Sequence, residues 1–290
     1  MKKELKNILE LNIALIIIAG AAPLGNYISL PPEIGIWSRC FFAFITLAIY
    51  VKIKGVSLIY NYKKDTGSFI FCAILQGGHW ITYFYALQLA GAGLGVISLF
   101  TFPIFTTLLE PFILKTKFNP KHLLLALVVL LGLYVLTPEF NFGNQTSLGI
   151  FFGIISAVFF ATRNILMKKH VATYDASMLM FYQNGWVALL LSPLLFLLDF
   201  KVTHYTNLLP YLIFLGAFTT AIGHTYYVKT FKYFSATTAS LLSCIQPVYV
   251  VILAYLFLNE QPTISTLIGG SIIVSAVILE SLISKKVKSS

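Results

Sequence analysis

Long apolar runs separated by short polar stretches are the feature that most constrains how this chain can fold. A helix needs about 20 apolar residues to cross a bilayer, whereas a barrel strand needs about 10 with alternating polarity. The runs have the helical length and lack the alternation. They predict ten membrane-spanning helices, at about 8–28, 35–53, 68–89, 92–114, 121–137, 147–167, 177–198, 208–230, 234–258 and 264–283.

Composition excludes the soluble classes of protein. Only 10% of the 290 residues are charged and 58% are hydrophobic, whereas a typical soluble domain has about 25% charged residues. A soluble fold of this size could not cover its surface with so few charges, and a disordered chain would be far less apolar. The predicted fold class is therefore an all-α integral membrane protein.

Basic residues predict the orientation in the membrane. The net charge of +10 comes from 20 Lys and Arg residues against 10 Asp and Glu residues. They gather in the short polar stretches, which indicates membrane topology rather than nucleic-acid binding. If the N-terminus is cytoplasmic and the spans alternate, every basic residue except Arg39 and Lys201 belongs to an inner segment, and Arg163 counts among the inner ones. This asymmetry predicts that both termini are cytoplasmic.

The two halves of the chain match at an offset of 144 residues without a gap. Residues 83–103 align with 227–247, so Pro103 lies over Pro247, about one third of the way along each run. Each half has five spans, an odd number, so the second half starts on the opposite side of the membrane and the repeats are inverted. We predict a first repeat at 1–138, an outer linker at 139–145, a second repeat at 146–285 and a basic cytoplasmic tail at 286–290.

Inverted repeats are typical of secondary transporters, with the substrate site near the midplane where the repeats meet. The alternative is that duplication merely makes a stable bundle. The first run follows Lys2, Lys3 and Lys6, as the apolar core of a signal peptide does. We expect this run to be retained, because the first repeat needs it to reach five spans.

Motifs for other chemistry do not occur in the sequence. There is no Walker A motif, no HExxH zinc motif and no GxSxG elbow. The cysteines Cys40, Cys72 and Cys244 lack metal-binding spacing. We therefore expect no cofactor, no metal site and no direct coupling to ATP.

Several short motifs resemble those of one transporter family over nearly the whole chain. They are Asn26, Trp37-Ser38-Arg39, Ala90-Gly91-Ala92-Gly93-Leu94-Gly95, Gln246-Pro247, Leu258-Asn259-Glu260-Gln261-Pro262-Thr263 and Gly269-Gly270-Ser271. On these residues the chain resembles a bacterial member of the drug/metabolite transporter superfamily, of the EamA type with two EamA repeats. One departure is Thr116, where the family often has Glu. The resemblance implies a bacterial inner-membrane location and export of amino acids or related compounds.

Polar side chains inside the apolar runs are costly at membrane depth, so they are the candidate functional residues. At the 144-residue offset Trp80 aligns with His224 and Tyr83 with Tyr227, near glycines in both halves. These aromatic residues either line a substrate cavity or serve only in packing. The candidate substrate-binding residues are Asn26, Arg39, His79, Trp80, Tyr83, Asn164, Gln183, His224 and Tyr227.

The candidates for ion coupling are His79, His224 and Glu110. The two histidines are either proton carriers or neutral hydrogen-bonding groups between helices. Glu110 either binds an amine or proton or pairs with Lys115. Arg39 either attracts a carboxylate or phosphate or extends to the outer interface. Asn26, Asn164 and Gln183 either contact the substrate or join helices.

The predicted function is a secondary transporter of a small organic metabolite, an amino acid or related compound, exported by alternating access. A non-transporting membrane sensor or scaffold is the first alternative, and a polytopic membrane enzyme is the second. His79, His224 and Glu110 form no recognised catalytic set, so we expect no enzyme activity. The expected partners are a small-molecule substrate and the lipid bilayer, with no nucleic acid. The oligomeric state stays open, with a homodimer as one arrangement.

Overall fold

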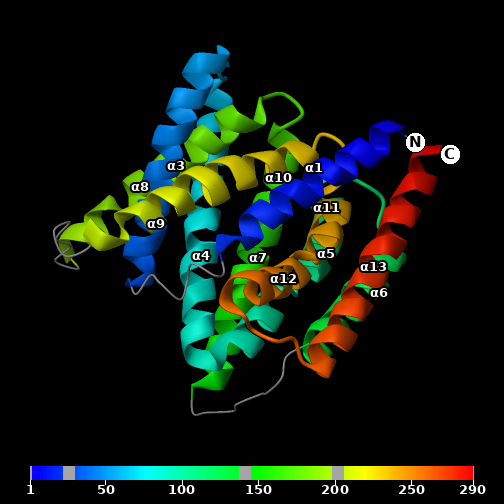
Figure 1. The fold of residues 1–290 in the computed structure, drawn as a ribbon. Helices are drawn as coiled ribbons and strands as arrows, with labels where there is room; N and C mark the ends of the chain where they lie inside the picture. The colour runs from blue at the N-terminus through cyan, green and yellow to red at the C-terminus, as the bar shows by residue number, and fades with distance from the viewer. Residues whose placement is uncertain (1, 22–29, 137–144, 198–205, 290) are drawn as a thin grey trace. The chain divides into compact units, whose positions relative to one another are not determined.

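The computed structural model describes residues 2–21, 30–136, 145–197 and 206–289, and within these ranges every regular element is a helix (Figure 1). The elements of the first half are α1 (Lys2–Ala19), α3 (Pro32–Lys54), α4 (Tyr62–Leu99), α5 (Phe102–Leu114) and α6 (Pro120–Leu136). Those of the second half are α7 (Thr146–His170), α8 (Ala176–Leu197), α9 (Leu209–Phe214), the π-helix η3 (Leu215–His224), α10 (Thr225–Thr230), α11 (Ala236–Ser243), α12 (Gln246–Leu258) and α13 (Ile264–Ser289).

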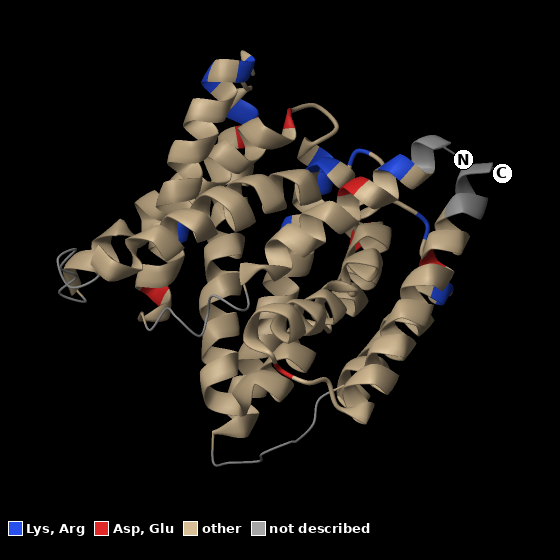
Figure 2. Cartoon of the chain, in the orientation of Figure 1, with Lys and Arg blue, Asp and Glu red and all other residues tan. Residues whose placement is uncertain are grey.

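The described helices have the length and composition of membrane spans. Seven stretches are long and apolar enough to cross a bilayer: Pro32–Lys54, Tyr62–Leu99, Thr146–His170, Ala176–Leu197, Thr206–Thr230, Ala236–Leu258 and Ile264–Ser284. The helices α5 and α6 are apolar but shorter. Charged residues are sparse along most helical turns (Figure 2). The prediction of an all-helical protein with many membrane spans is confirmed.

Helix ends in the two halves recur at the repeat offset. The helices α5 and α12 begin and end 144 residues apart, and each ends at a non-glycine residue in the left-handed conformation, Lys115 (φ 56°) and Asn259 (φ 57°). Pro103 and Pro247 lie in the first turns of these helices, where a missing N–H costs no helical hydrogen bond. Each proline therefore starts a new helix within its apolar run, and the stretch Ala236–Leu258, which contains Pro247, still has the length and composition of one membrane span.

One glycine interrupts the longest helix. Gly91 in α4 has φ 79° and ψ 165°, a backbone conformation that glycine adopts readily and other residues do not. The break falls where the runs 68–89 and 92–114 were expected to meet. The turn between the third and fourth predicted spans thus depends on a residue without a Cβ atom.

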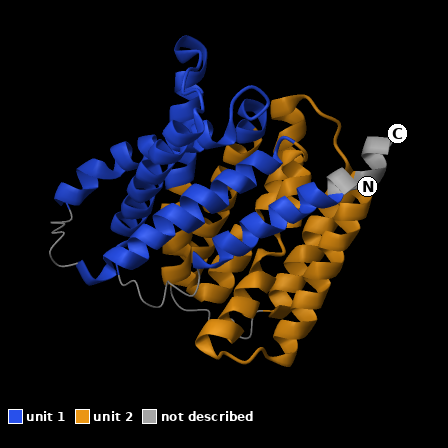
Figure 3. Cartoon of the chain, turned by 45° about the horizontal axis from the view of Figure 1, so that its top comes forward, with its two compact units in different colours: residues 1–77, 166–232 blue, residues 78–165, 233–290 orange. Residues whose placement is uncertain are grey.

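The chain divides into two compact units that do not follow the halves of the sequence. Unit 1 contains residues 1–77 and 166–232, and unit 2 contains residues 78–165 and 233–290 (Figure 3). The helices α4 and α7 each begin in one unit and end in the other. Each unit therefore draws on both halves of the chain.

Unit 1 is built around α3, which packs against α8 and η3, while α1 packs against η3 and α10. The indole N–H of Trp37 donates to the Ser192 hydroxyl (3.2 Å), and the rings of Phe44 and Phe181 stack with centroids 4.7 Å apart. A Cβ atom added to Gly185 would lie 2.9 Å from the Phe44 ring. The glycine therefore allows α8 to approach α3 closely.

Unit 2 is built around the pair α6 and α13, which lie along one another. A Cβ atom added to Gly269 would lie 2.4 Å from the carbonyl oxygen of Gly132, so neither helix tolerates a side chain at this crossing. The helix α11 packs against α5, α6 and α13. The core of the unit consists of Leu99, Phe100, Phe102, Leu125, Ala126, Val129, Leu133, Ala157, Ala161, Leu241, Cys244, Ile273 and Ala276.

Candidate functional site

In unit 1, the guanidinium group of Arg39 contacts the π-helix η3. Arg39 comes seven residues after the start of α3, about 10 Å along the helix axis. Its Nε donates to the Thr220 hydroxyl at 3.0 Å and a terminal nitrogen to the Thr219 hydroxyl at 3.5 Å. Both threonines are fully buried. The arginine therefore donates hydrogen bonds to two buried hydroxyls of η3.

The backbone around these threonines is unusual. The stretch Leu215–His224 is a π-helix of ten residues. This conformation is rare in proteins, and where it occurs it is often at a functional site. A Cβ atom added to Gly216 would lie 2.4 Å from the Phe42 Cβ and 2.9 Å from the Arg39 carbonyl oxygen. Gly216 therefore lets η3 lie directly against the turn of α3 that carries Arg39.

His224 and Tyr227 follow in η3 and α10 of unit 1. His224 ends η3 and is 6% exposed, and Tyr227 in α10 is 2% exposed. The Tyr227 ring meets Phe231 edge to face at 5.1 Å. A Cβ atom added to Gly223 would lie 2.9 Å from Ile18 in α1. Both predicted residues are therefore packed inside unit 1.

Three buried amides lie on α4 and α8 in unit 1. They are Gln76, Gln183 and Asn184, each 1% exposed or less. The Asn184 Nδ2 donates to the Met180 carbonyl oxygen at 2.7 Å, within its own helix. Neither polar atom of the Gln76 side chain has a hydrogen-bond partner in the described part of the chain. Such atoms are rare in native proteins and require an explanation.

In unit 2, His79 joins α4 to α7. The Ser156 hydroxyl donates to the His79 carbonyl oxygen at 2.8 Å, and its oxygen lies 2.8 Å from the imidazole Nδ1. Because the hydroxyl has one hydrogen to donate, Nδ1 must be the donor of the second bond. The ring stacks on Phe160 with centroids 4.5 Å apart. His79 therefore connects the two helices, and its role as a proton carrier or a neutral hydrogen-bonding group stays a prediction.

The other predicted residues of unit 2 are buried or partly buried. Trp80 is 5% exposed, and Tyr83 packs against the core of the unit. Asn164 is fully buried, and its Oδ1 accepts a hydrogen bond from Arg163 at 3.0 Å. Arg163 lies within α7 and is also fully buried. Its assignment to an inner polar segment is therefore wrong, because α7 continues to His170.

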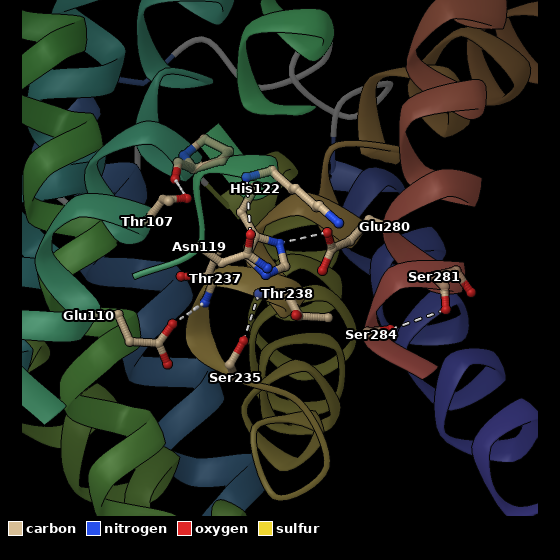
Figure 4. A network of polar contacts seen from close by, with 12 residues as sticks. Thr107, Glu110, Asn119, His122, Ser235, Thr237, Thr238, Glu280, Ser281 and Ser284 are labelled. Carbon is tan, nitrogen blue, oxygen red and sulfur yellow. Dashed lines mark hydrogen bonds and ion pairs between the residues drawn. The ribbon is translucent and has the colours of Figure 1, made fainter. Parts of the chain in front are cut away.

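Glu110 lies at the N-terminus of α11. One carboxylate oxygen accepts from the backbone N–H of Ala236 (2.8 Å) and the other from that of Thr237 (2.7 Å), and Glu110 is 4% exposed (Figure 4). The Ser235 hydroxyl caps the same helix by accepting from Thr238 N–H at 3.0 Å. Negative charge is favourable at a helix N-terminus. The carboxylate therefore serves as a helix cap rather than as the partner of Lys115.

A second buried carboxylate belongs to the pair α6 and α13. The Glu280 Oε2 lies 2.8 Å from the His122 Nδ1 (Figure 4), and Glu280 is fully buried whereas the His122 side chain is 14% exposed. The other oxygen, Oε1, has no hydrogen-bond partner among the described residues. The pair lies about ten residues from the Gly132–Gly269 crossing along each helix.

One end of unit 1 carries a polar network on α4, α7 and the segment that follows α7. Tyr174 donates to Asp65 at 2.6 Å, which raises the pKa of Tyr174, and Ser68 bonds His170 at 2.6 Å. Asp175 caps α8 by accepting from Ser177 N–H at 2.8 Å. Burial alone would raise the pKa of Asp175, but the Ser177 hydrogen bonds and nearby Lys232 lower it below its ordinary value.

The predicted site residues divide between the two units. Unit 1 holds Arg39, Gln183, His224 and Tyr227, and unit 2 holds His79, Trp80, Tyr83, Glu110 and Asn164. Asn26 lies outside the described residues. That Trp80, Tyr83, His224 and Tyr227 line one cavity therefore stays a prediction.

Four residues with distinctive settings were absent from the predicted set: Gln76, His122, Arg163 and Glu280. Glu280 is the clearest omission, because an acid within the run 264–283 already violates the apolar pattern. Arg163 and Gln76 also fall inside predicted runs, at 147–167 and 68–89. His122 falls inside the run 121–137 as well, so treating every polar residue inside a run as a candidate would have found all four.

Together these features describe an all-helical, multi-pass membrane protein with polar side chains buried inside its spans. The model of the EamA-like transporter family matches residues 6–137 and 147–282. The chain therefore belongs to the EamA-like transporter family, as its motifs predict.

Relatives and a solved structure agree with this assignment. The S-adenosylmethionine uptake transporter of Rickettsia prowazekii is 27% identical over 258 residues, which cover 87% of this chain and 83% of the relative. The pseudopaline exporter CntI of Pseudomonas aeruginosa is 24% identical over 233 residues, 80% of this chain and 81% of the relative. A solved crystal structure matches 97% of this chain and 98% of its own with a TM-score of 0.81 at 18% identity, which shows the common fold. A multi-pass location in a bacterial membrane follows.

Proposed function

We propose that this protein is a secondary transporter that exports a small organic metabolite by alternating access between two inverted five-helix repeats. The repeated helix ends at the 144-residue offset, in α5 and α12, support the duplication. An odd number of spans in each repeat gives two repeats of opposite orientation, which alternating access requires. In this arrangement both termini are cytoplasmic.

The contact of Arg39 with the π-helix is the observation that carries the substrate class. A guanidinium inside an apolar layer is costly, and residues of this kind mark substrate pathways by default. Arg39 donates to two hydroxyls, Thr219 and Thr220, which orient the guanidinium group. Its planar donors fit a carboxylate. The substrate we propose is therefore a carboxylate-bearing solute of the amino-acid type.

Export is the direction we propose, in line with the relative named as a pseudopaline exporter. A relative named for uptake has similar coverage. The sensor, scaffold and enzyme alternatives lack a supporting observation of comparable specificity, whereas buried polar groups inside spans are expected of a carrier.

Counterflow in proteoliposomes tests the proposal. The purified protein is first screened by thermal shift against amino acids, amines, nucleobases, sugars and organic acids, because a ligand at 100 times its dissociation constant adds about 2.7 kcal/mol to stability. The stabilising solute is then labelled. A carrier shows saturable uptake that is stimulated by unlabelled solute on the opposite side, and a protein that binds the solute but shows no counterflow is a sensor or scaffold.

Variants of α3 test the substrate class. Arg39→Gln should raise the KM for a carboxylate solute at least tenfold, which corresponds to about 1.4 kcal/mol, and Arg39→Lys should restore part of the loss. Lys54→Gln is the matched control, because it removes one positive charge from an exposed position of the same helix. Wild-type kinetics in Arg39→Gln would exclude the carboxylate assignment. Cytoplasmic and periplasmic reporter fusions at the C-terminus test the orientation.

A further inference from the structure

The side chain of Gln76 is buried without hydrogen bonds. It is 1% exposed, and neither Oε1 nor Nε2 has a partner within the described ranges. A buried amide that forms no hydrogen bond destabilises a protein, and an apolar side chain of similar shape is usually as stable or more so. Packing therefore does not explain glutamine at this position.

A second orphaned amide atom belongs to the adjacent helix. Asn184 is fully buried, and its Nδ2 donates to Met180, but its Oδ1 has no partner in the described chain. A Cβ atom added to Gly77 would lie 3.6 Å from Val187, one turn after Asn184. This contact brings the turn of α4 that carries Gln76 beside the polar stretch of α8. Helical side chains point toward the N-terminus of their helix, so the Gln76 amide reaches back toward the level of Asn184.

The missing hydrogen bonds define what would satisfy them. The Gln76 amide offers one acceptor and two N–H donors in a single plane, and Asn184 adds an acceptor. A glutamine amide of this kind pairs through two hydrogen bonds with a planar edge that has a donor beside an acceptor, as it does with adenine. A lone carboxylate or ammonium group would use only one kind of Gln76 atom and leave the other unsatisfied.

We propose that Gln76 and Asn184 recognise a planar donor–acceptor edge of the transported solute, as found in a primary carboxamide or an amino-substituted nucleobase. This inference rests on the proposed function, because it names a chemical group of the solute that is carried. Gln76 acts as the specificity-determining residue and Asn184 receives the additional N–H of the amino group.

Two matched pairs of probes test the edge directly on the full-length wild-type protein in nanodiscs. Glutamine is compared with glutamate, which lacks the amide donors, and adenine with purine, which lacks the exocyclic amine. We expect glutamine or adenine to bind at least tenfold more tightly than its matched analogue, and the one that binds identifies the source of the edge. The proposal would be overturned if each amide- or amine-bearing probe bound no more tightly than its matched analogue, or if neither glutamine nor adenine bound.

The variant Gln76→Met separates recognition from packing. We expect the melting temperature of the ligand-free protein to stay the same or rise, because two unsatisfied buried atoms are removed, while affinity for the bound probe falls at least tenfold. Gln88→Met is the matched control, since Gln88 is an exposed glutamine of the same helix. Binding by Gln76→Met within twofold of wild type overturns the proposal. If this variant does not fold, the paired probes on the wild type decide the question.

Failure of this inference is distinguishable from failure of the proposed function. A solute that shows counterflow with a KM unaffected by Gln76→Met would overturn the edge assignment and leave transport standing. A probe that binds in a Gln76-dependent manner without counterflow would overturn transport and leave the binding site standing.

Discussion

The carboxylate of Glu110 allows a quantitative test of whether this residue caps a helix or carries a proton. Its two oxygens accept hydrogen bonds from the backbone N–H groups of Ala236 and Thr237, and the side chain is almost completely buried. Glu110→Gln keeps one acceptor oxygen and places N–H donors against the other backbone N–H. Glu110→Ala removes both acceptors.

The expected losses follow from the two bonds. A hydrogen bond to a charged acceptor contributes about 1.5–3 kcal/mol, and a buried donor left unpaired carries a cost of similar size. We expect the free energy of unfolding to fall by about 1.5–3 kcal/mol in Glu110→Gln and by about 3–6 kcal/mol in Glu110→Ala. At roughly 2–4 °C per kcal/mol, the glutamine variant should melt roughly 3–12 °C below wild type.

Fluorescence-monitored thermal unfolding in detergent measures this difference. Glu260→Gln is the control, because Glu260 is exposed just after α12 and its removal should change the melting temperature little. Equal melting temperatures for Glu110→Gln and Glu260→Gln would refute the capping argument. If Glu110 only caps the helix, transport by the folded Glu110→Gln variant should still depend on a pH gradient. If Glu110 carries the proton, this dependence should be lost.

Three further predictions concern packing, a buried pair and pH. Gly216→Ala should lower the free energy of unfolding by about 1–3 kcal/mol, because the added Cβ would lie 2.9 Å from the Arg39 carbonyl oxygen. Gly35→Ala, whose Cβ would meet no atom within 4 Å, should leave stability unchanged or raise it by up to about 1 kcal/mol, and chemical denaturation compares the two variants. His122→Leu should destabilise by about 3–5 kcal/mol, and adding Glu280→Met should recover most of that loss; a double variant no more stable than the single one contradicts a paired role. Asp175→Ala should lower the melting temperature at pH 7. Because the Asp175 pKa lies below its ordinary value of 3.8, the gap in melting temperature between wild type and variant should shrink only as the pH falls below about 3.8. A gap at pH 3 as large as that at pH 7 argues against the capping role of Asp175.

The spans were predictable because apolar length is a local property of the sequence. The runs 177–198 and 264–283 correspond to α8 and α13 with ends shifted by a few residues. The break before Pro103 was not predictable from hydropathy, since both sides of it are apolar. The π-helix at 215–224 was equally hidden, because hydropathy does not report the hydrogen-bond pattern.

The polar partners were harder to predict than the spans. Lys115 was considered as a partner of Glu110 because it is close in sequence, whereas the N–H groups that donate to Glu110 lie 126 and 127 residues away. Arg163 was misassigned because a basic residue near the end of a run was counted with the adjoining polar stretch, although α7 continues past it. Interhelical contacts depend on which helix faces meet, and a single sequence does not contain that information.

The interleaved units have a consequence for how the protein is made. Unit 1 needs residues from both sides of 78–165, and unit 2 needs residues from both sides of 166–232. At about 5–20 residues per second, the ribosome takes roughly 8–31 s to extend the chain from residue 77 to residue 232. During that time the first helices lie in the membrane without the partners that complete their unit. Neither unit can therefore be completed until its second segment has been synthesised. A chain truncated near residue 138 would lack part of both units, and it should be degraded by membrane quality-control proteases.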